Sequence, residues 1–346
     1  MNDVTAAALA PALFTLTTGP VNCYPEVLSA IAKPVLYDYD PAFLAFYEAT
    51  VLKLQKALRI QTVPVILQGE PVLGLEAAAA SLVAPGDVVL NLVSGVYGAG
   101  YGEWLKPRAG SFHEIRVAYD EVIDPAEVAA FLDAHPEVTL VAICHHDTPS
   151  GTLNPIEEIG RVVRAHGALY VVDSVSAWAG VEMDLDAVGA DLLVTGPNKC
   201  LGCPAAVSIV AVSDRAWAKM AANPAAPRAW LVSILDWKEG WRKENPFPFT
   251  PSVAEINALD AGLDRYLGEG PEAVWARHAT TAAAMRAGVV AMGLELWAAR
   301  PAIASPTCTA VKLPAGVDET ALRALMKRRY GVVISSGRAE TFNRLV

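Results

Sequence analysis

Ala168-Leu-Tyr-Val-Val-Asp173 and, after a gap of helix length, Asp191-Leu-Leu-Val-Thr195 are two short apolar runs that decide the fold. Similar runs alternate with amphipathic or alanine-rich stretches from residue 64 to about 212, which is typical of right-handed crossovers and a mainly parallel sheet. We therefore expect an α/β protein. The seven predicted strands span 64–67, 88–93, 114–117, 139–145, 168–173, 191–195 and 206–212.

Helical patterns fill the gaps between these strands and continue toward the C-terminus. The proline-rich segment 223–252 predicts an ordered excursion that is neither strand nor helix. The long helices after it lead into a smaller C-terminal unit. The predicted helices span 73–82, 125–134, 156–166, 214–222, 254–267 and 271–292.

Composition limits the classes of function. The 346 residues are 53% hydrophobic and 18% charged, as in ordinary globular enzymes, and the net charge of -10 argues against a nucleic-acid partner. The chain lacks an apolar run long enough to span a membrane and a secretory signal at its start. Five scattered cysteines favour a reducing compartment, so we expect a cytoplasmic protein.

Two strand endings carry the chemistry. Asp173 ends one apolar strand, where a carboxylate either caps the next turn or serves a ligand. Lys199 follows another strand in the uncharged turn Gly196-Pro-Asn-Lys199, where desolvation would lower its pKa and free its amine for imine chemistry. Together they are the two parts that a pyridoxal enzyme needs, because Lys199 would form the imine and move the proton while Asp173 keeps the pyridine nitrogen protonated.

Neighbouring residues offer further contacts. Tyr97 follows the strand 88–93 and would stack on a ring, or it is a tyrosine at the edge of the core. The segment Cys144-His-His-Asp-Thr-Pro-Ser-Gly151 offers hydroxyl groups to the ring's 3-oxygen. His145 and His146 point to opposite faces of a strand, which favours structural hydrogen bonds over a shared metal ion. Cys200 and Cys203 lack a second ligand pair, so no metal is expected there.

These motifs resemble the class V, fold-type I aminotransferases along nearly the whole chain. The matching strings are Thr18-Gly-Pro20, Tyr37-Asp-Tyr-Asp40, Asp147-Thr-Pro-Ser-Gly151, Asp173-Ser-Val-Ser176 and Gly196-Pro-Asn-Lys199. The resemblance implies an N-terminal arm (1–20), a large vitamer-binding domain (21–255), a small C-terminal domain (256–346), and a homodimer or higher oligomer with shared active sites. It also implies the catalytic residues Lys199 and Asp173, and ring contacts from Tyr97, Thr148, Ser174 and Ser176.

Two further strings, Gly69-Glu-Pro-Val-Leu-Gly-Leu-Glu-Ala-Ala78 and Pro246-Phe-Pro-Phe-Thr-Pro-Ser252, are most similar to members that exchange an amine between pyridoxamine and pyruvate. This likeness implies that pyridoxamine and pyruvate become pyridoxal and L-alanine through a Schiff base on Lys199, in vitamin B6 degradation. Pyridoxal and pyridoxamine would then bind as substrates rather than as a resident cofactor.

The turn Gln68-Gly69-Glu70-Pro71 stands where ordinary members bind the cofactor phosphate at a helix N-terminus. Pro71 lacks an N–H donor and Glu70 places negative charge at the positive end of the helix, so tightly bound pyridoxal phosphate is not expected. Alternatively, Glu70 only caps the helix at Val72 and phosphate binds elsewhere. Asn198 and Thr250 could give such a phosphate residual contacts.

Pyruvate needs a cation for its carboxylate, and Arg338 is the nearest candidate. The family's own carboxylate-binding arginine belongs to an Arg-Ile-Gly segment that we expect directly after Val346, so either the chain continues or Arg338 or Arg344 takes its place. Two other functions stay open: a pyridoxal-phosphate-dependent aminotransferase of the alanine–glyoxylate or serine–pyruvate type, and a non-catalytic vitamer-binding protein.

Overall fold

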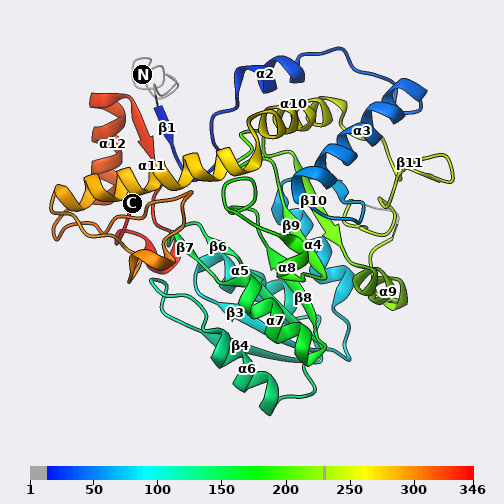
Figure 1. Ribbon diagram of the computed structural model, residues 1–346, viewed down its shortest axis with the longest axis horizontal. Coiled ribbons are helices and arrows are strands. Elements are labelled where there is room, and N and C mark those ends of the chain that lie inside the picture. The colour runs from blue at the N-terminus through cyan, green and yellow to red at the C-terminus, as the bar shows by residue number, and fades with distance from the viewer. Residues whose placement is uncertain (1–13, 229–230) are drawn as a thin grey trace, which may run out of the picture.

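A seven-stranded sheet forms the centre of the computed structural model, which describes residues 14–228 and 231–346 (Figure 1). The strand order is β2-β10-β9-β8-β5-β3-β4. β10 is antiparallel to both neighbours and the other pairs are parallel, which confirms the predicted α/β class and mainly parallel sheet. The bounds lie within three residues of prediction: β2 Val65–Gln68, β3 Val88–Val93, β4 Ser111–Arg116, β5 Leu140–Cys144, β8 Leu169–Asp173, β9 Leu192–Thr195 and β10 Val207–Val212.

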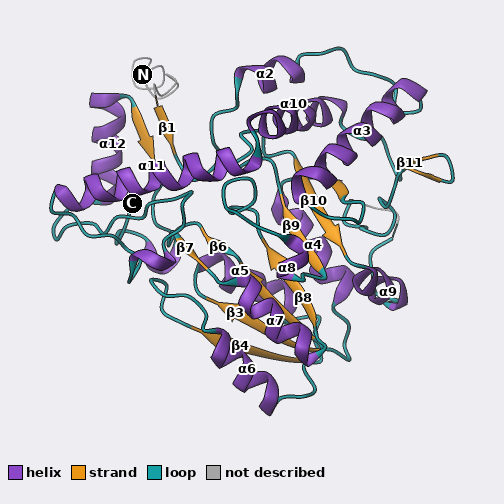
Figure 2. Cartoon of the chain, in the orientation of Figure 1, coloured by secondary structure: helices purple, strands orange, loops and turns teal. Residues whose placement is uncertain are grey.

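Helices cover both faces of this sheet (Figure 2). Helices α4 (Pro71–Leu82) and α5 (Val96–Leu105) pack on one face. Helices α6 (Pro125–Ala134), α7 (Ile156–His166) and α8 (Leu185–Val188) pack against one another on the other face. α4 and α5 connect strands in the direction of β4, whereas α6, α7 and α8 connect strands in the direction from β4 to β9. Because crossovers are right-handed, the two groups of helices must lie on opposite faces of the sheet.

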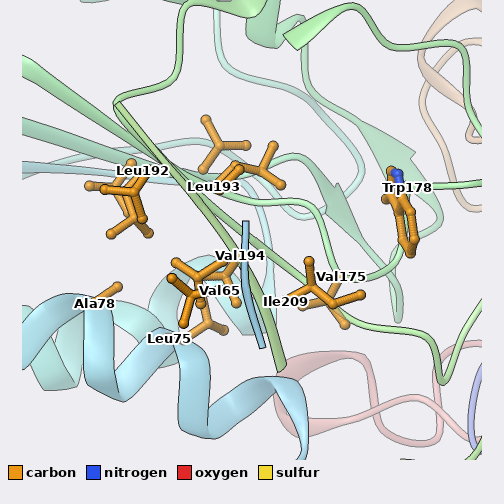
Figure 3. Packing of buried hydrophobic residues seen from close by; sticks show 14 of the residues in the cluster. Val65, Leu75, Ala78, Val175, Trp178, Leu192, Leu193, Val194 and Ile209 are labelled. Carbon is orange, nitrogen blue, oxygen red and sulfur yellow. The ribbon is translucent and has the colours of Figure 1, made fainter. Parts of the chain in front are cut away.

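Part of the core lies between α4 and the strands of the sheet (Figure 3). Leu75 packs with Val194 of β9 and Ile209 of β10, and all three side chains are buried. A Cβ atom at Gly74 would lie 2.8 Å from the Cβ of Ser208 and 2.9 Å from a methyl group of Val194. Only glycine lets α4 come this close to the strands, so the start of the helix is held firmly at the edge of the sheet.

Further helices pack around this core, and α9, α10 and α11 among them agree with prediction. They are α2 Pro25–Ile31, α3 Pro41–Leu58, α9 Asp214–Ala222, α10 Val253–Glu269, α11 Pro271–Ala291 and α12 Glu319–Tyr330. The prediction omitted α2, α3, α5, α8 and α12. In α3 the buried residues Phe43, Tyr47, Val51, Leu54 and Leu58 recur at helical spacing, so this signal was present in the sequence.

Short strands join distant parts of the chain. β1 (Phe14–Leu16) pairs in parallel with β13 (Val332–Ile334), and β6 (His146–Asp147) pairs with β7 (Thr152–Leu153). The expectation of no strand in 223–252 was wrong, because β11 (Trp241–Arg242) and β12 (Asn245–Pro246) form a small hairpin there, closed by the aromatic packing of Trp241 on Tyr47. Two short 3₁₀ helices, η1 (Pro301–Ile303) and η2 (Ala339–Thr341), complete the elements.

The predicted domain limits stay a prediction. The proposed arm, 1–20, lies partly outside the described residues, and its described end includes β1. The limit between 255 and 256 falls in the first turn of α10, a helix that packs on α2 and α3. None of the described helices is both long and apolar enough to cross a lipid bilayer.

Candidate active site

The carboxyl ends of β5, β8 and β9 meet at one edge of the sheet. Cys144 pairs with Asp173 across β5 and β8, and Asp173 pairs with Val194 across β8 and β9. Ligands of open parallel sheets bind beyond the carboxyl ends of the strands. The side chains that follow these three strands therefore form the candidate active site.

Asp173 is the last residue of β8 and its side chain is buried. Its Oδ1 atom accepts a hydrogen bond from the backbone N–H of Val175 at 3.0 Å. Burial raises the pKa of Asp173 to about 6, although the hydrogen bond from Val175 opposes this change. A buried carboxylate is stabilised by a cationic partner, and a protonated pyridine nitrogen is a partner of that kind.

Lys199 lies in the turn after β9, where it is partly buried. Burial lowers the pKa of its amine, while the charges of Glu70 and Asp173 oppose this change. A lowered pKa leaves more of the amine neutral, the state in which it acts as a nucleophile. The sequence expectation of a desolvated lysine thus agrees with the geometry.

The loop that contains Thr18 covers this amine. The Nζ atom of Lys199 donates a hydrogen bond to the backbone oxygen of Thr18 at 2.6 Å. Gly19 has a φ of 126°, and a Cβ atom there would overlap the amine of Lys199. Glycine is therefore required beside the amine, and the bond to Thr18 holds the lysine in this position.

The N-terminus of α4 points into the same region and is occupied by Glu70. Oε2 of Glu70 accepts a hydrogen bond from the backbone N–H of Val72 at 2.8 Å, and Oε1 accepts one from Nδ2 of Asn198 at 3.3 Å. Pro71 is the first residue of the helix. Glu70 thus caps α4 at Val72, as the alternative reading of this turn also requires. It also places a carboxylate near Lys199.

Tyr97 lies in the first turn of α5, and that helix start is capped from outside. Its N-cap residue, Gly95, offers no side chain, and Oδ2 of Asp147 accepts the hydrogen bond of the Tyr97 backbone N–H at 2.8 Å. The Ser150 hydroxyl donates to Oδ1 of Asp147 at 3.2 Å. A Cβ atom at Gly95 would overlap the Asp147 carboxylate, so glycine is needed for this contact.

Asp147 has no exposed surface. Burial raises the pKa of Asp147 to about 6, while the hydrogen bonds from Tyr97 and Ser150 oppose this change. Asp147 and Asp173 are therefore two buried carboxyl groups on neighbouring strand ends, and the charge of Asp147 adds to the raised pKa of Asp173.

Hydroxyl groups line the turns after β5 and β8. The Thr148 hydroxyl donates to the Ser176 hydroxyl oxygen at 2.5 Å, so these two predicted ring contacts lie together. The predicted contact Ser174 instead turns its hydroxyl toward Nδ1 of His145 at 3.1 Å, inside the protein.

Hydrogen bonds hold both histidines of this segment. Nδ1 of His146 lies 3.0 Å from the backbone oxygen of Ser176 and 3.2 Å from the Thr307 hydroxyl. Burial lowers the pKa of His145 to about 3 and that of His146 to about 4, so both rings are neutral. This agrees with the structural hydrogen bonds expected from the sequence.

The remaining predicted contacts lie at the rim. Nη1 of Arg338 donates a hydrogen bond to the Tyr97 hydroxyl at 3.1 Å, so the exposed guanidinium lies beside the predicted stacking residue. Arg344 lies over the ring of Trp297 at 4.9 Å. The backbone oxygen of Thr250 accepts a hydrogen bond from Nε2 of Gln68 at 2.8 Å, which places Thr250 beside the turn that precedes α4.

Cys200 and Cys203 have separate surroundings. The sulfur of Cys200 lies 3.9 Å from the backbone oxygen of Ser176, and that of Cys203 lies 3.4 Å from the backbone oxygen of Ala258. Burial raises the pKa of both thiols to about 12. Both thiols are therefore neutral at physiological pH.

Sequence reasoning missed Asp147, Gly95 and the Thr18 carbonyl as parts of this site. Asp147 directly follows a strand and two histidines, which was a usable signal. Its partners Gly95 and Tyr97 lie about 50 positions away in the chain. A pairing at that distance follows only from the arrangement of β3 beside β5.

A family model described as aminotransferase class V matches residues 104–343. Together with the relatives below, this match shows that the chain belongs to the class V aminotransferases, and the resemblance predicted from its motifs is confirmed. Members of the class generally use pyridoxal phosphate.

A curated relative, the pyridoxamine–pyruvate transaminase of Mesorhizobium japonicum, is 62% identical over 96% of this chain and 85% of its own length. The crystal structure of pyridoxamine–pyruvate aminotransferase from Mesorhizobium loti is similar with a TM-score of 0.96 over 97% of this chain and 86% of that chain. The alanine–glyoxylate aminotransferase structure from Nostoc sp. is 27% identical, with a TM-score of 0.92 over 97% of this chain and 89% of that chain.

Proposed function

We propose that this aminotransferase exchanges an amine between a vitamin B6 form without phosphate and a small 2-oxo acid, converting pyridoxamine and pyruvate to pyridoxal and L-alanine. The relative that is 62% identical supports the substrates. The buried Asp173 and the desolvated Lys199 support the chemistry. We assign the reaction to the degradation of vitamin B6, because its product is the unphosphorylated aldehyde.

The observation that carries this proposal is the carboxylate of Glu70 at the N-terminus of α4. It already takes the Val72 N–H, and Pro71 offers none, so a phosphate group would find few donors there. At about 4 Å and an effective dielectric near 20, each unit of phosphate charge would be repelled by about 4 kcal/mol. The site fits a pyridine ring but does not fit its phosphate.

Unphosphorylated pyridoxal and pyridoxamine carry a hydroxyl group in place of the phosphate. A hydroxyl donates a hydrogen bond, and the carboxylate of Glu70 accepts one. Asn198, held at 3.3 Å from Glu70, fixes the orientation of this carboxylate. The same residue that repels phosphate thus selects the vitamer, and Thr250 and Gln68 border this end of the site.

Lys199 and Asp173 divide the chemistry between them. The bound pyridine ring supplies the electron sink for removal of a proton from the amino acid Cα. In the reverse direction, the neutral amine of Lys199 attacks the carbonyl carbon of pyridoxal and water leaves. L-alanine then displaces Lys199, the freed amine carries the Cα proton to the former carbonyl carbon, and hydrolysis releases pyruvate and pyridoxamine. Asp173 holds the proton of the pyridine nitrogen, because the ionised carboxylate needs a cationic partner in its buried place.

Other residues hold the ring in position. We assign stacking on the ring face to Tyr97, and a contact to the ring hydroxyl to the bonded pair Thr148 and Ser176. Ser174, buried behind them, keeps His145 in place and supports the turn after β8. Arg338 binds the carboxylate of pyruvate or alanine, since it is exposed at the rim beside Tyr97 while Arg344 packs on Trp297.

We also propose a homodimer or higher oligomer whose active sites are shared between subunits. The loop between α2 and α3 exposes a group of large apolar side chains that a second subunit would cover. Their exposed fractions are 78% for Val35, 41% for Leu36, 69% for Tyr37 and 57% for Tyr39. Sedimentation velocity on the purified protein tests this, and a monomer at assay concentration would overturn it.

Coupled assays of the purified enzyme test the function. With pyridoxamine and pyruvate we expect equal amounts of pyridoxal and L-alanine, and Lys199→Ala should lower kcat by at least about a thousandfold because the nucleophile and proton carrier is lost. Lys243→Ala, a change at an exposed lysine between β11 and β12, is the matched control and should be fully active. Turnover with alanine, glyoxylate and added pyridoxal phosphate, without turnover of pyridoxamine, would favour the phosphate-dependent alternative.

A further inference from the structure

Two histidines and a glutamate come together at the far edge of the sheet. His113 lies on β4, the last strand in the sheet order, and His135 is the C-cap residue of α6. Glu137 follows two positions after His135. One ligand atom from each of the three residues, here called the edge cluster, lies within 4.8 Å of the other two.

Packing holds the two imidazoles toward one another. The ring of His135 stacks on Phe131, one helical turn earlier, with centroids 4.2 Å apart and planes inclined by 23°. The ring of His113 meets the same Phe131 edge-on at 5.5 Å and lies 5.0 Å from the ring of His135. One aromatic side chain therefore orients both potential ligands before any ion arrives.

The third ligand is already placed beside them. Nδ1 of His135 and Oε1 of Glu137 are 3.0 Å apart. A glutamate carboxylate is charged at neutral pH, so Glu137 is able to bind a cation. Its side chain is 52% exposed, so it can adjust its position and leave a coordination site open to water.

The chemistry of this donor set indicates the class of ion. Two imidazoles and a carboxylate suit borderline divalent metals such as Zn²⁺ and Co²⁺, whereas Mg²⁺ and Ca²⁺ prefer oxygen ligands alone. With bonds of about 2.0–2.2 Å, the ligand atoms around a tetrahedral zinc ion lie about 3.3 Å apart. Small rotations of the exposed Glu137 side chain and of the imidazoles would bring the ligand atoms from their present spacing to the spacing around zinc.

We propose that the edge cluster binds one Zn²⁺ ion through His113, His135 and Glu137, with water as the fourth ligand. The ion would join the edge strand β4 to the end of α6 and to the segment that enters β5. The segment containing His135 and Glu137 precedes the amino end of β5, whereas Asp147 and Asp173 follow the carboxyl ends of their strands. The site is thus separate from the active site, and Figure 1 shows β4 and α6 together at the bottom of the view.

Calorimetric titration of the chelator-treated protein with ZnCl₂ tests the proposal. We expect one ion per chain, with affinity at least about tenfold weaker in His113→Ala and in His135→Ala, because loss of even an outer-shell partner costs 10–100-fold. Glu137→Gln changes only an exposed side chain and should also weaken binding. His278→Ala, a change at a half-buried histidine on α11, is the matched control and should bind as the unaltered protein does.

Two further measurements distinguish the edge cluster from zinc binding elsewhere on the protein. Zn²⁺ should raise the Tm of the unaltered protein and of His278→Ala but not that of Glu137→Gln, because an ion that binds only the folded state stabilises it. Co²⁺ should give the visible bands of tetrahedral nitrogen and oxygen ligation. Thiolate charge-transfer absorption would assign the ion to the cysteines, and that result, or equal affinity in all variants, would overturn the proposal.

Measurement of enzyme turnover in the variants tests whether the edge cluster is independent of the proposed reaction. All three variants should convert pyridoxamine and pyruvate at the rate of the unaltered enzyme, because the edge cluster lies at the opposite end of the strands from Lys199. Zinc binding that disappears together with turnover would contradict this separation. Zinc binding by a protein that does not turn over pyridoxamine would leave the edge cluster standing and overturn only the proposed function.

Discussion

The N-termini of α4 and α5 both meet a carboxylate at the edge of the active site, but they obtain it in different ways. Glu70 caps α4 from within the helix's own sequence, two positions before the N–H that it accepts. α5 starts at Gly95 and is capped by Asp147, which belongs to β6. Glu70 is partly exposed, whereas Asp147 is fully buried.

This difference in exposure suits the two carboxylates to different roles: Glu70 to ligand selection and Asp147 to support of the fold. A partly exposed carboxylate at the start of α4 is able to meet a substrate, and in the proposed function it repels phosphate there and accepts a hydroxyl group. A buried carboxylate at the start of α5 meets only the protein, where it fixes the first turn that carries Tyr97. We therefore expect changes at α5 to affect stability most and changes at α4 to affect ligand choice most.

Gly95→Ala should have the largest effect. The added methyl group overlaps the Asp147 carboxylate, so the acid must leave the Tyr97 N–H or the strand must shift. Overpacking together with a lost buried hydrogen bond should lower the free energy of unfolding by about 3 kcal/mol and lower kcat/KM at least tenfold. Urea unfolding and steady-state kinetics measure both quantities.

Gly100→Ala is the matched control for that change. It alters the same helix at an exposed position where a Cβ atom meets nothing within 4 Å. We expect it to raise the free energy of unfolding by about 0.5–1 kcal/mol, as for glycine replacement inside helices, and to leave kinetics unchanged. Equal behaviour of the two variants would remove the special role of the Asp147 contact.

Asp147→Asn should change how stability depends on pH. The folded-state pKa of Asp147, about 6, exceeds the usual value of 3.8, so the folded state holds its proton more tightly than the unfolded state. The contribution of Asp147 to the free energy of unfolding is largest below pH 4. It decreases by about 3 kcal/mol in total as the pH rises to about 6. The Asp147→Asn variant should lack this pH-dependent decrease in the free energy of unfolding.

Asp173 contributes a fall in the same pH range, since its pKa is also about 6. The pH-dependent loss of stability should therefore shrink in Asp147→Asn without vanishing. Urea unfolding between pH 4 and pH 7 measures it. An unchanged slope in the variant would mean that Asp147 does not hold its proton as the structure implies.

Glu70→Gln should affect stability less and ligand choice more. Glutamine still offers an oxygen to the Val72 N–H, so the cost in unfolding free energy should stay below about 1 kcal/mol. Removal of the charge should strengthen binding of pyridoxal phosphate at least about tenfold, because repulsion of several kcal/mol disappears. Glu76→Gln, an exposed change in the same helix, is the control and should leave phosphate binding unaltered.

Tyr97→Phe should have the smallest effect. It removes only the hydroxyl that accepts a hydrogen bond from Arg338 at the rim, which is worth about 0.5–1.5 kcal/mol. We expect KM for pyruvate to rise about threefold while kcat and the free energy of unfolding stay nearly unchanged. In Tyr101→Phe the lost hydroxyl has no hydrogen-bond partner among the described residues, so KM should not change there.

The same two helices show what the sequence could predict. α4 and its cap follow from local chemistry: an acid, a proline at the first helical position and an apolar run. α5 contains Gly98, Gly100 and Gly102, which disfavour a helix. It forms because a distant carboxylate caps it and because Gly98 and Gly102 pack closely against their neighbours.

Lys199 and Asp173 were predictable for the same local reason, since each directly ends or follows an apolar strand. The sheet and most helices likewise follow from short periodic patterns. Two further features depend on contacts between segments far apart in the chain, which no local pattern encodes: the Thr18 carbonyl over Lys199 and the pairing of β1 with β13. Residues that only the topology brings together could not be identified without the structure.

Absorbance titration of the purified protein with pyridoxal and, separately, with pyridoxal phosphate tests the central claim most directly. We predict that pyridoxal gives the visible band of a lysine-bound aldehyde, that L-alanine bleaches it, and that Lys199→Ala shows no band. Pyridoxal phosphate should bind far more weakly. Tight binding of the phosphate form with no band from pyridoxal would contradict the role assigned to Glu70 and leave a phosphate-dependent aminotransferase.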